Sequence, residues 1–503
     1  MIWKLRFVWD LEIGIWKFKI MFDKLLHKIK KIIPKKLWDY LWPIYHFSWG
    51  VLGNLLYRHP SQKMIVIGVT GTTGKTTSVY LIAQMLKAAG YQVGYTSTAM
   101  FGDGHKEWLN DKKMTMPGRL FNFRLMNRMV KNKCQYAVVE TSSEGIIQYR
   151  HRFINYDILV LTGLYPEHIE SHGSFEAYRE AKGMLFAHLK DCKTKYIDAE
   201  RRVKPVEAGI KKLSLDRVKK TIIVNGDDEH KDYFLNFWAE SKIEYHLTER
   251  VPVEIKDEDF AAKDHNWLKL IACQTVISRE ASSFILCHSG QCFKDEPIEL
   301  KLLGGFNIAN AMNAAAVGLS QGLSLQQIKE GLESVTGIPG RLEQINAGQP
   351  FSVIVDYAFE PRAVEKLYET IDLIPHSRVI HILGSAGGGR DVARRPVLGK
   401  IAGAKADIAI VTNEDPYDDD PQIIVDQVAL GAEKSGKVLD KDLFKIMDRR
   451  EAIAKAFSLA RASDIVLITG KGSEQAICVK GGKKIKWDDR EAAREELKKI
   501  LNK

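Results

Sequence analysis

The feature that most constrains this 503-residue chain is a glycine-rich turn between a strand-like run and a helix-like run. Ile and Val dominate residues 64–69, and the turn reads Gly68-Val-Thr-Gly-Thr-Thr-Gly-Lys-Thr-Thr77. Backbone N–H groups of such a turn face phosphate oxygens, the following helix N-terminus adds the positive end of its dipole, and a lysine reaches the terminal phosphates. We predict an ATP site with Mg²⁺ on the Thr76 hydroxyl, formed by Gly71, Thr72, Thr73, Gly74, Lys75, Thr76 and Thr77.

Strand-like and helix-like patterns alternate from residue 63 onward, with one Gly/Pro break at 337–340. This alternation is typical of an α/β fold with a mostly parallel sheet covered on both faces. Residues 240–300 are less regular, and we interpret them as added strands and loops. We expect three parts: a helical segment over 1–62, an ATP-binding domain over 63–337 and a second α/β domain over 338–503. The first domain should contain strands at 64–69, 135–140 and 157–162 and helices at 75–89, 174–189, 309–321 and 325–334; the second should contain strands at 352–356, 378–383, 407–412 and 464–469 and a helix at 361–372.

Residues 1–62 differ in composition from the rest of the chain. They hold eleven Lys and Arg against four Asp and Glu, which is +7 of the net charge of +11, and six of the ten tryptophans. Because the remainder is nearly balanced, a general nucleic-acid surface is excluded. Two readings stay open: a basic amphipathic helix on an anionic membrane surface, or a helical pair packed on the next domain. Asp39, Pro43 and His46 argue against a plain membrane span.

The six cysteines include no CxxC pair. Cys287 and Cys292 are the only close couple, and no matching second pair completes a zinc pattern. We therefore expect neither a metal nor a disulfide at these positions. The N-terminal apolar stretches are broken by Lys and Asp, unlike a signal peptide. Together these features predict a reduced cytoplasmic protein, with the inner membrane face as a peripheral location.

Further segments follow the turn in a recognisable order. They read Val138-Val-Glu-Thr-Ser-Ser-Glu-Gly145, Tyr165-Pro-Glu-His-Ile-Glu-Ser-His with Glu176-Ala-Tyr-Arg-Glu-Ala-Lys182, Gly304-Gly-Phe-Asn-Ile-Ala-Asn310, Gly340-Arg-Leu-Glu343, Asp356-Tyr-Ala, Gly389-Arg-Asp391, Arg394-Arg-Pro396, Asp415-Pro416 and Gly470-Lys-Gly-Ser-Glu474. Taken together and in this order, they resemble the Mur ligase family. The resemblance covers the chain from about residue 64 to the C-terminus. It implies a central ATPase domain and a Rossmann-like C-terminal domain.

The resemblance also implies a reaction, in which ATP phosphorylates a carboxylate and an amine then displaces the phosphate. Since a carboxylate is a poor electrophile, the protein's task is positioning and charge stabilisation. Glu140 and Thr76 would hold one Mg²⁺, His168 a second, and Lys182 would be carbamylated and so become anionic. The nucleotide base, the ribose and the closed domains would be held by Asn307, Asn310, Arg341 and Asp356.

Within the family, the tripeptide-forming ligases of peptidoglycan synthesis fit best. The acceptor would be UDP-MurNAc-L-Ala-D-Glu, a nucleotide-sugar peptide, and we expect a monomer. Acceptor contacts are expected from Thr115, Ser142, Ser143 and Arg150. Contacts with the added amino acid are expected from Arg390, Asp415, Pro416, Tyr417, Gly470 and Glu474, with Glu474 on its ammonium group.

Departures from the family pattern keep alternatives open. Only about 62 residues precede the phosphate turn, where the tripeptide ligases have a larger uridine-binding domain, so a lipid-bound or shortened acceptor is an alternative. Phe359 replaces a histidine of the family pattern. Tyr417 replaces an arginine that receives the distal carboxylate of diaminopimelate, and Asp418, Asp419 and Asp420 follow it. An acidic pocket favours lysine or ornithine, whereas a solvated acidic loop would favour neither. Rival readings are a folylpolyglutamate-type ligase, a ligase for another envelope polymer, or a non-catalytic nucleotide-dependent scaffold.

Overall fold

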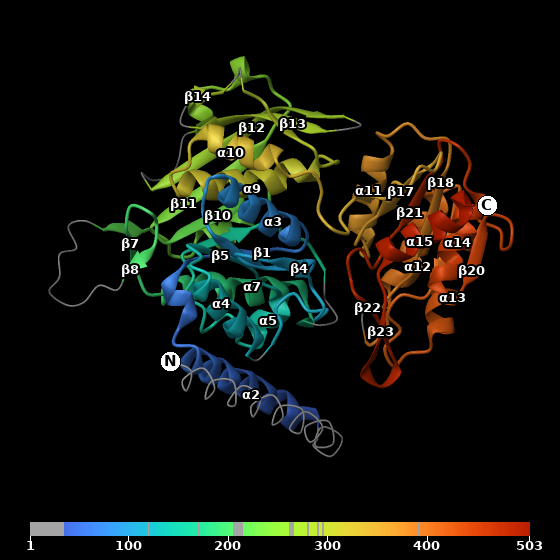
Figure 1. The fold of residues 1–503 in the computed structure, drawn as a ribbon, viewed down its shortest axis with the longest axis horizontal. Coiled ribbons are helices and arrows are strands. Elements are labelled where there is room, and N and C mark those ends of the chain that lie inside the picture. Colours follow the sequence, from blue (N-terminus) through green and yellow to red (C-terminus); the bar gives the residue numbers. More distant parts are fainter. Residues whose placement is uncertain are drawn as a thin grey trace.

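A computed structural model describes residues 35–118, 120–167, 172–204, 215–260, 266–278, 281–288, 291–293, 296–389 and 392–502. Side chains before residue 44 are outside this description. Most of the basic Trp-rich segment therefore lies outside the described residues, as do His168 and Arg390. The described chain forms two α/β units side by side, with a long helix below the larger one (Figure 1).

The larger unit is built on a twelve-stranded sheet in the order β14-β13-β12-β11-β10-β6-β1-β5-β2-β3-β4, with β15 paired to β13. The strands from β12 to β2 run parallel, and antiparallel strands extend the sheet at both edges. The strand bounds are β1 (Ile65–Thr70), β2 (Val93–Thr96), β3 (Met100–Asp103), β4 (Glu107–Leu109), β5 (Tyr136–Glu140), β6 (Ile158–Leu161), β10 (Thr221–Asn225), β11 (Ser241–Leu247), β12 (Trp267–Ile277), β13 (Ser282–His288), β14 (Gln291–Cys292) and β15 (Ile298–Leu300).

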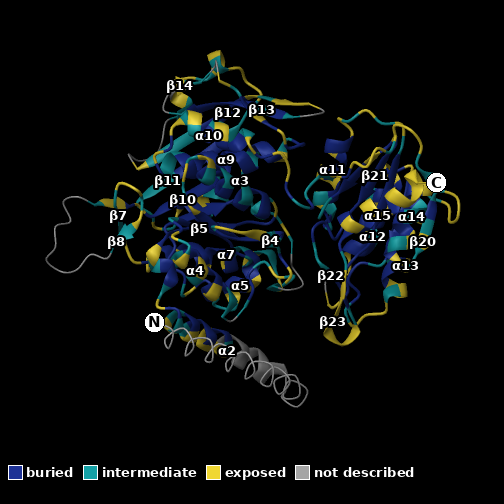
Figure 2. Ribbon diagram, in the orientation of Figure 1, coloured by how far each residue is buried: buried dark blue, intermediate teal, exposed yellow. Residues whose placement is uncertain are grey.

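Helices cover both faces of this sheet because alternate residues of its strands point to opposite sides. Ile65, Ile67 and Val69 of β1 pack on one face, and Met64 and Val66 pack on the other. One face is covered by α3 (Lys75–Ala88), α9 (Phe306–Ser320) and α10 (Leu325–Glu333). The other is covered by α4 (Phe121–Lys131), α7 (Phe175–Leu189) and α8 (Lys231–Leu235), with the short α5 (Ser143–Ile147) beside α7. The strands are consequently buried on both sides (Figure 2).

The smaller unit has a six-stranded sheet in the order β16-β17-β21-β18-β19-β20. Its strands are β16 (Glu343–Gln344), β17 (Ser352–Val355), β18 (Val379–Leu383), β19 (Ile408–Thr412), β20 (Leu443–Ile446) and β21 (Ile465–Ile468), and only the β16–β17 pairing is antiparallel. One face is covered by α11 (Pro361–Ile371), α12 (Arg394–Lys405) and α13 (Pro421–Glu433), the other by α14 (Arg449–Leu459) and α15 (Asp489–Leu501).

Smaller elements complete the described chain. A three-stranded sheet consists of β7 (Lys195–Ile197), β8 (Val203–Lys204) and β9 (Asp216–Val218), and a hairpin of β22 (Ala476–Val479) and β23 (Lys483–Lys486). Short 3-10 turns lie at η1 (Pro60–Lys63), η3 (Pro252–Glu254), η4 (Asp257–Phe260) and η5 (Lys480–Gly482).

Helix α2 (Lys35–Leu56) lies against the larger unit with two glycines at the contact. A Cβ at Gly50 would lie 2.5 Å from the Phe153 ring, and one at Gly53 would lie 2.5 Å from the Phe123 ring. Only glycine therefore allows this close approach. Among the described residues, no helix is long and apolar enough to cross a membrane.

The strands and helices expected in the two α/β units appear within one to three residues of the expected ends. One expectation was wrong. Cys287 and Cys292 were expected to carry no bond, and the structure joins them in a disulfide. They lie directly opposite one another on paired antiparallel strands, a proximity that sequence spacing alone does not reveal.

Candidate functional site

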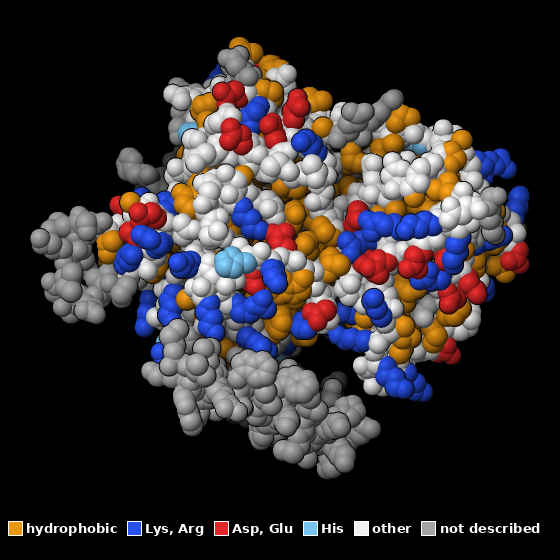
Figure 3. Space-filling view, in the orientation of Figure 1, with side chains coloured by type: hydrophobic (Ala, Val, Ile, Leu, Met, Phe, Trp, Pro, Cys, Tyr) orange, Lys and Arg blue, Asp and Glu red, His pale blue; other side chains and the backbone are white. Residues whose placement is uncertain are grey.

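A cleft of about 1160 Å³ lies between the two units, and residues of both line it. The larger unit contributes the turn after β1 and the ends of β5 and β6. Sites in parallel sheets form at the carboxyl ends of the strands, where loops from neighbouring strands meet. The smaller unit contributes residues after β17, β19 and β21. Figure 3 shows a hollow between the units, with Lys and Arg side chains on both sides of it.

The turn between β1 and α3 has the geometry expected of a phosphate-binding loop. Gly71 and Gly74 have φ values of 149° and 78°, which glycine adopts without strain. The Lys75 ammonium folds back and donates to the carbonyls of Gly71 (3.0 Å) and Thr72 (2.6 Å). Burial lowers the pKa of Lys75. The lysine therefore lies over the turn, where a nucleotide's terminal phosphates would replace those carbonyls as its hydrogen-bond acceptors.

Thr76 and Glu140 form the hard-oxygen pair that Mg²⁺ prefers. The Thr76 hydroxyl donates to Glu140 Oε2 at 2.9 Å, and both groups are buried. Thr98 fixes the same carboxylate through its N–H (2.7 Å) and its hydroxyl (2.8 Å), and Thr115 continues the chain to Thr98 at 2.9 Å. The pair sits at the first turn of α3, beside the phosphate loop. These oxygens fit a magnesium ion between protein and phosphates.

Lys182 lies beside the phosphate turn and is almost fully buried on α7. Its ammonium donates to the Gly71 carbonyl at 2.8 Å and lies 4.5 Å from the centre of the Tyr178 ring. The Tyr178 hydroxyl in turn donates to Thr72 Oγ1 at 3.2 Å. Burial, with a smaller effect of the Lys75 charge, holds the pKa of Lys182 well below its ordinary value. A lowered pKa makes the neutral amine, which is the form that reacts with CO₂, easier to reach than in an exposed lysine.

Asn307 and Asn310 join helix α9 to the phosphate loop. Asn310 accepts a hydrogen bond from Ser78 (3.2 Å) and donates to Asn307 Oδ1 (3.0 Å), and Asn307 donates to the Leu303 carbonyl (2.7 Å). A Cβ at Gly74 would lie 2.4 Å from Asn310 Oδ1. Both amides line the cleft. Their hydrogen-bond partners are protein groups, so in this structure the two amides connect helix α9 to the start of helix α3.

Arg341 and Asp356 lie where the chain passes between the units. An Arg341 Nη2 is 3.4 Å from Thr76 Oγ1, and the guanidinium lies 4.4 Å from the centre of the Tyr357 ring. Asp356 accepts from the N–H groups of Leu342 and Ala358, both at 2.7 Å. Burial raises the pKa of Asp356. Arg341 therefore reaches from the smaller unit to Thr76 of the larger one, while Asp356 holds the chain at Leu342 and Ala358.

The residues expected to contact the acceptor gather along one wall of the cleft. Ser142 caps α5 by accepting from the Gly145 N–H at 3.2 Å, and the Ser143 hydroxyl lies 3.1 Å from His172 Nε2. Arg150 donates to the carbonyl of Met116 and therefore lies on the cleft next to the segment that contains Thr115.

Four charged side chains meet at the opposite end of the cleft. Asp415 accepts from Lys471 (3.0 Å) and from Lys113 (2.6 Å), and Glu474 lies 2.6 Å from Lys471 and 3.1 Å from Lys113. Burial alone would lower the pKa of Lys113, but the carboxylates of Glu474 and Asp415 outweigh it and raise that pKa. The Lys113 ammonium thus sits, fully charged, between two acidic groups of the other unit.

The other positions expected at this end are near that cluster. Tyr417 lines the cleft and has a left-handed backbone (φ 51°), and its ring lies against Gly388. Pro416 precedes it. Gly470 (φ 101°) comes so close to Glu414 that a Cβ would lie 2.3 Å from its carboxylate. His168 and Arg390 are outside the described residues, so their predicted roles stay predictions.

Three residues of the cleft were missed in the sequence. Lys113 belongs to no recognised segment. Glu360 is buried in the cleft, and burial, with a smaller contribution from Glu167, raises its pKa to about 7. Arg394 is buried, and its Nε and one Nη have no hydrogen-bond partner among the described residues. Arg394 lies in one of the segments quoted in the sequence analysis, so the sequence pointed to its position but not to its burial. Lys113 and Glu360 depend on contacts between segments that are distant in the chain.

Comparisons with known proteins identify the family of the chain. The Mur ligase middle domain matches residues 69–318, and the Mur ligase glutamate ligase domain matches residues 340–472. A UDP-N-acetylmuramyl-tripeptide synthetase of Roseiflexus sp. (strain RS-1) is 34% identical over 451 residues, covering 89% of this chain and 81% of the relative.

Solved structures show the same arrangement. A UDP-N-acetylmuramoyl-L-alanyl-D-glutamate–2,6-diaminopimelate ligase is 26% identical, with a TM-score of 0.53 over 89% of this chain and 82% of that one. A Mycobacterium tuberculosis folylpolyglutamate synthase complexed with ADP and AMPPCP shares the fold at 16% identity, with a TM-score of 0.60 over 85% and 92%. The chain therefore belongs to the Mur ligase family and is an ATP- and Mg²⁺-dependent ligase that forms amide bonds.

Proposed function

We propose that this ligase adds a diamino acid with a distal ammonium group, lysine or ornithine, to UDP-MurNAc-L-Ala-D-Glu. The observation that carries this is the position of Lys113, whose alkylammonium lies between Asp415 and Glu474. Two carboxylates are balanced there by Lys113 and Lys471. If Lys113 withdraws, one negative charge is left uncompensated in a buried pocket, and a substrate ammonium can take its place.

The neighbouring acidic run does not supply this pocket. Asp418 accepts from the Gly481 N–H (2.8 Å), Asp419 pairs with Arg395 (3.3 Å) and Asp420 caps α13. None of the three lines the cleft. The argument for a distal ammonium therefore moves from Asp418–Asp420 to Asp415 and Glu474. Tyr417, which carries no positive charge, offers nothing to the distal carboxylate of diaminopimelate.

The phosphate end supports the activation step. The acceptor carboxylate attacks the γ-phosphorus of ATP, ADP departs, and the amine then attacks the acyl carbon with loss of inorganic phosphate. Lys75 and the turn would hold the phosphates, while Thr76 and Glu140 would hold Mg²⁺, which neutralises charge on them. We propose that Lys182 is carbamylated, because burial lowers the pKa of its ammonium and the neutral amine left by loss of that proton is the nucleophile that CO₂ requires. The phosphate, acceptor and amino-acid walls all belong to one chain, so we propose that the enzyme acts as a monomer.

The test is a screen of amino acids against UDP-MurNAc-L-Ala-D-Glu, with phosphate release and product mass as readouts. Lysine or ornithine should give the highest kcat/KM and a product heavier by one amino-acid residue. A preference for diaminopimelate would overturn the amino-acid assignment. No stimulation by any amino acid would reject the acceptor, and a folate-type or lipid-linked acceptor would then be tested with the same assay.

We also propose a peripheral membrane contact through residues 1–62. The inward face of α2 packs Trp49, Gly50 and Gly53 on the larger unit, yet its outward face is apolar as well. Ile44, Leu52 and Leu55 are 51%, 46% and 61% exposed and lie on one stripe of the helix. The accompanying charge of +7 and six tryptophans fit an anionic lipid surface.

Flotation of the full chain with vesicles tests this contact. Vesicles of anionic phospholipid should carry the protein upward, neutral vesicles should carry less, and Leu52→Glu with Leu55→Glu should abolish the difference while activity is kept. Equal flotation of the double variant would reject the lipid surface. Dimer formation in the absence of vesicles would assign the face to a second copy instead.

A further inference from the structure

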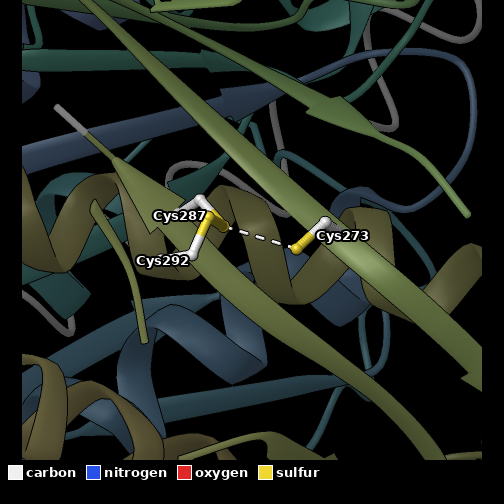
Figure 4. A group of neighbouring side chains, drawn as sticks. All are labelled: Cys273, Cys287 and Cys292. Carbon is white, nitrogen blue, oxygen red and sulfur yellow. Dashed lines mark hydrogen bonds between the residues drawn. A yellow bond between two sulfur atoms is a disulfide. The ribbon is translucent and has the colours of Figure 1, made fainter. Parts of the chain in front are cut away.

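Three cysteines meet on one face of the larger sheet, outside the catalytic cleft. Cys273 lies on β12, Cys287 on β13 and Cys292 on β14, and Figure 4 shows their sulfurs converging. Their Sγ atoms all lie within 4.8 Å of one another. None of them lines the cleft, so the ligase reaction does not use them.

Strand register explains the convergence. Cys287 pairs directly with Cys292, whereas Cys273 pairs with Ile285, two places along from Cys287. Residues two apart share a face, and diagonal neighbours across antiparallel strands remain within reach. The Cys273 and Cys287 sulfurs are consequently 3.3 Å apart.

The Cys287–Cys292 disulfide does not account for the third sulfur of the cluster. The Cys287–Cys292 bond uses two sulfurs, and the third is buried in contact with it. A soft divalent cation would use all three, since thiolates are its preferred ligands and Zn–S distances are about 2.3 Å. Tetrahedral zinc places its sulfurs about 3.8 Å apart, close to the Cys273–Cys287 separation. Only Cys292, on the two-residue strand β14, needs to move away from Cys287.

The surroundings are mostly apolar and leave one of the three sulfurs accessible. Ile271 and Ile285 flank the buried sulfurs, with Ile255 and Phe260 packed against them, while Cys292 is partly exposed. Zn²⁺ with three thiolates carries one negative charge. Arg250 is next to the cluster: its carbonyl accepts from the N–H of Gln274, and its guanidinium pairs with Asp259 at 3.0 Å.

We propose that Cys273, Cys287 and Cys292 of the reduced chain bind one Zn²⁺ ion, with water as the fourth ligand. A thiol reductant first gives two electrons and two protons to the disulfide and is itself oxidised to a disulfide. Three thiols then lose three protons to the solvent as the ion binds. The metal fastens the β13–β14 hairpin to β12, at an edge where unpaired strands otherwise invite association.

The test measures zinc bound to the full chain after reduction, zinc loading and dialysis. Wild type should retain about one zinc per chain and, with Co²⁺, show a thiolate-to-metal absorption band. Cys273→Ser should bind zinc roughly 100-fold more weakly, a loss at least as large as those from outer-shell changes. Cys134→Ser, at a buried thiol that contacts the Asp103 carbonyl, is the matched control and should retain the metal.

The contrary results are equally definite. Zinc content no higher than in Cys273→Ser would overturn the proposal. So would a Cys287–Cys292 disulfide that persists in reductant, detected as four rather than six free thiols after denaturation. Cys273→Ser leaves that disulfide possible, so loss of zinc with an unchanged melting temperature of the metal-free protein separates metal binding from misfolding.

Discussion

The groups at the phosphate end of the cleft come mainly from the larger unit, around the turn between β1 and α3, whereas the charged groups at the other end come from both units. Lys113 and Asp415 are separated by 302 residues and belong to different units. The phosphate end can therefore form within the larger unit alone. At the amino-acid end, Asp415, Lys471 and Glu474 come from the smaller unit and only Lys113 comes from the larger one, so this cluster is where charged side chains of the two units meet.

Removing Lys182 should give the largest effect and test the phosphate end. Lys182→Ala deletes the group beside Gly71 and should lower kcat by about 10³-fold or more, the upper range for losing one preorganised charged group. Phosphate release measures this. A small carboxylate such as acetate should partly restore turnover if the native group is a carbamate.

The matched control is Lys190→Ala, at an exposed lysine just after α7. It should keep wild-type turnover. Near-normal turnover in Lys182→Ala would contradict the assignment of this lysine. A loss of turnover would be attributed to misfolding only if the variant also lost its melting transition.

Glu140→Gln should give the next largest effect. The amide keeps the shape of the side chain but removes the charge that Mg²⁺ requires, so kcat should fall by about 10²-fold. The Mg²⁺ concentration for half-maximal rate should rise at the same time. Glu180→Gln, an exposed position on α7, serves as control. An unchanged Mg²⁺ dependence would place the metal on other ligands.

Lys113→Met tests the amino-acid end. If the Lys113 ammonium competes with the substrate, its loss should lower KM for lysine or ornithine by about tenfold, equivalent to about 1.4 kcal/mol. KM for a neutral amino acid should not fall. Lys112→Met changes the more exposed neighbour and should have no effect. A fall in kcat with unchanged KM would mean that Lys113 only fastens the units together.

The same contrast decides what the sequence could reveal. The turn at Gly71–Thr77 and the strands on either side were predictable because their geometry follows from neighbouring residues. Glu140 and Lys182 were reached through ordered motifs, although their burial was not visible. Lys113 and the Cys273 contact were missed, because each depends on pairings between segments that no local pattern records. Asp418–Asp420 were considered as an acidic pocket for the amino acid, but they lie outside the cleft. A run of acidic residues looks the same in the sequence whether it caps a helix or lines a pocket.

Glu360 lies in the cleft, near Lys75 of the phosphate loop, and its replacement should give the smallest effect. It belongs to the smaller unit, just before α11, and its carboxylate interacts with the charges of Lys75 and Arg394. Burial raises its pKa to about 7 from 4.5, so the native state keeps a proton that the unfolded state loses. Stability should therefore fall as pH rises from about 4.5 to 7, by at most about 1.4 kcal/mol per pH unit. Glu360→Gln removes this proton exchange. The melting temperature of the variant minus that of wild type should increase between pH 5 and 7 and then stay constant above pH 7. A constant difference between pH 5 and 7 would mean that Glu360 is already ionised in the folded protein.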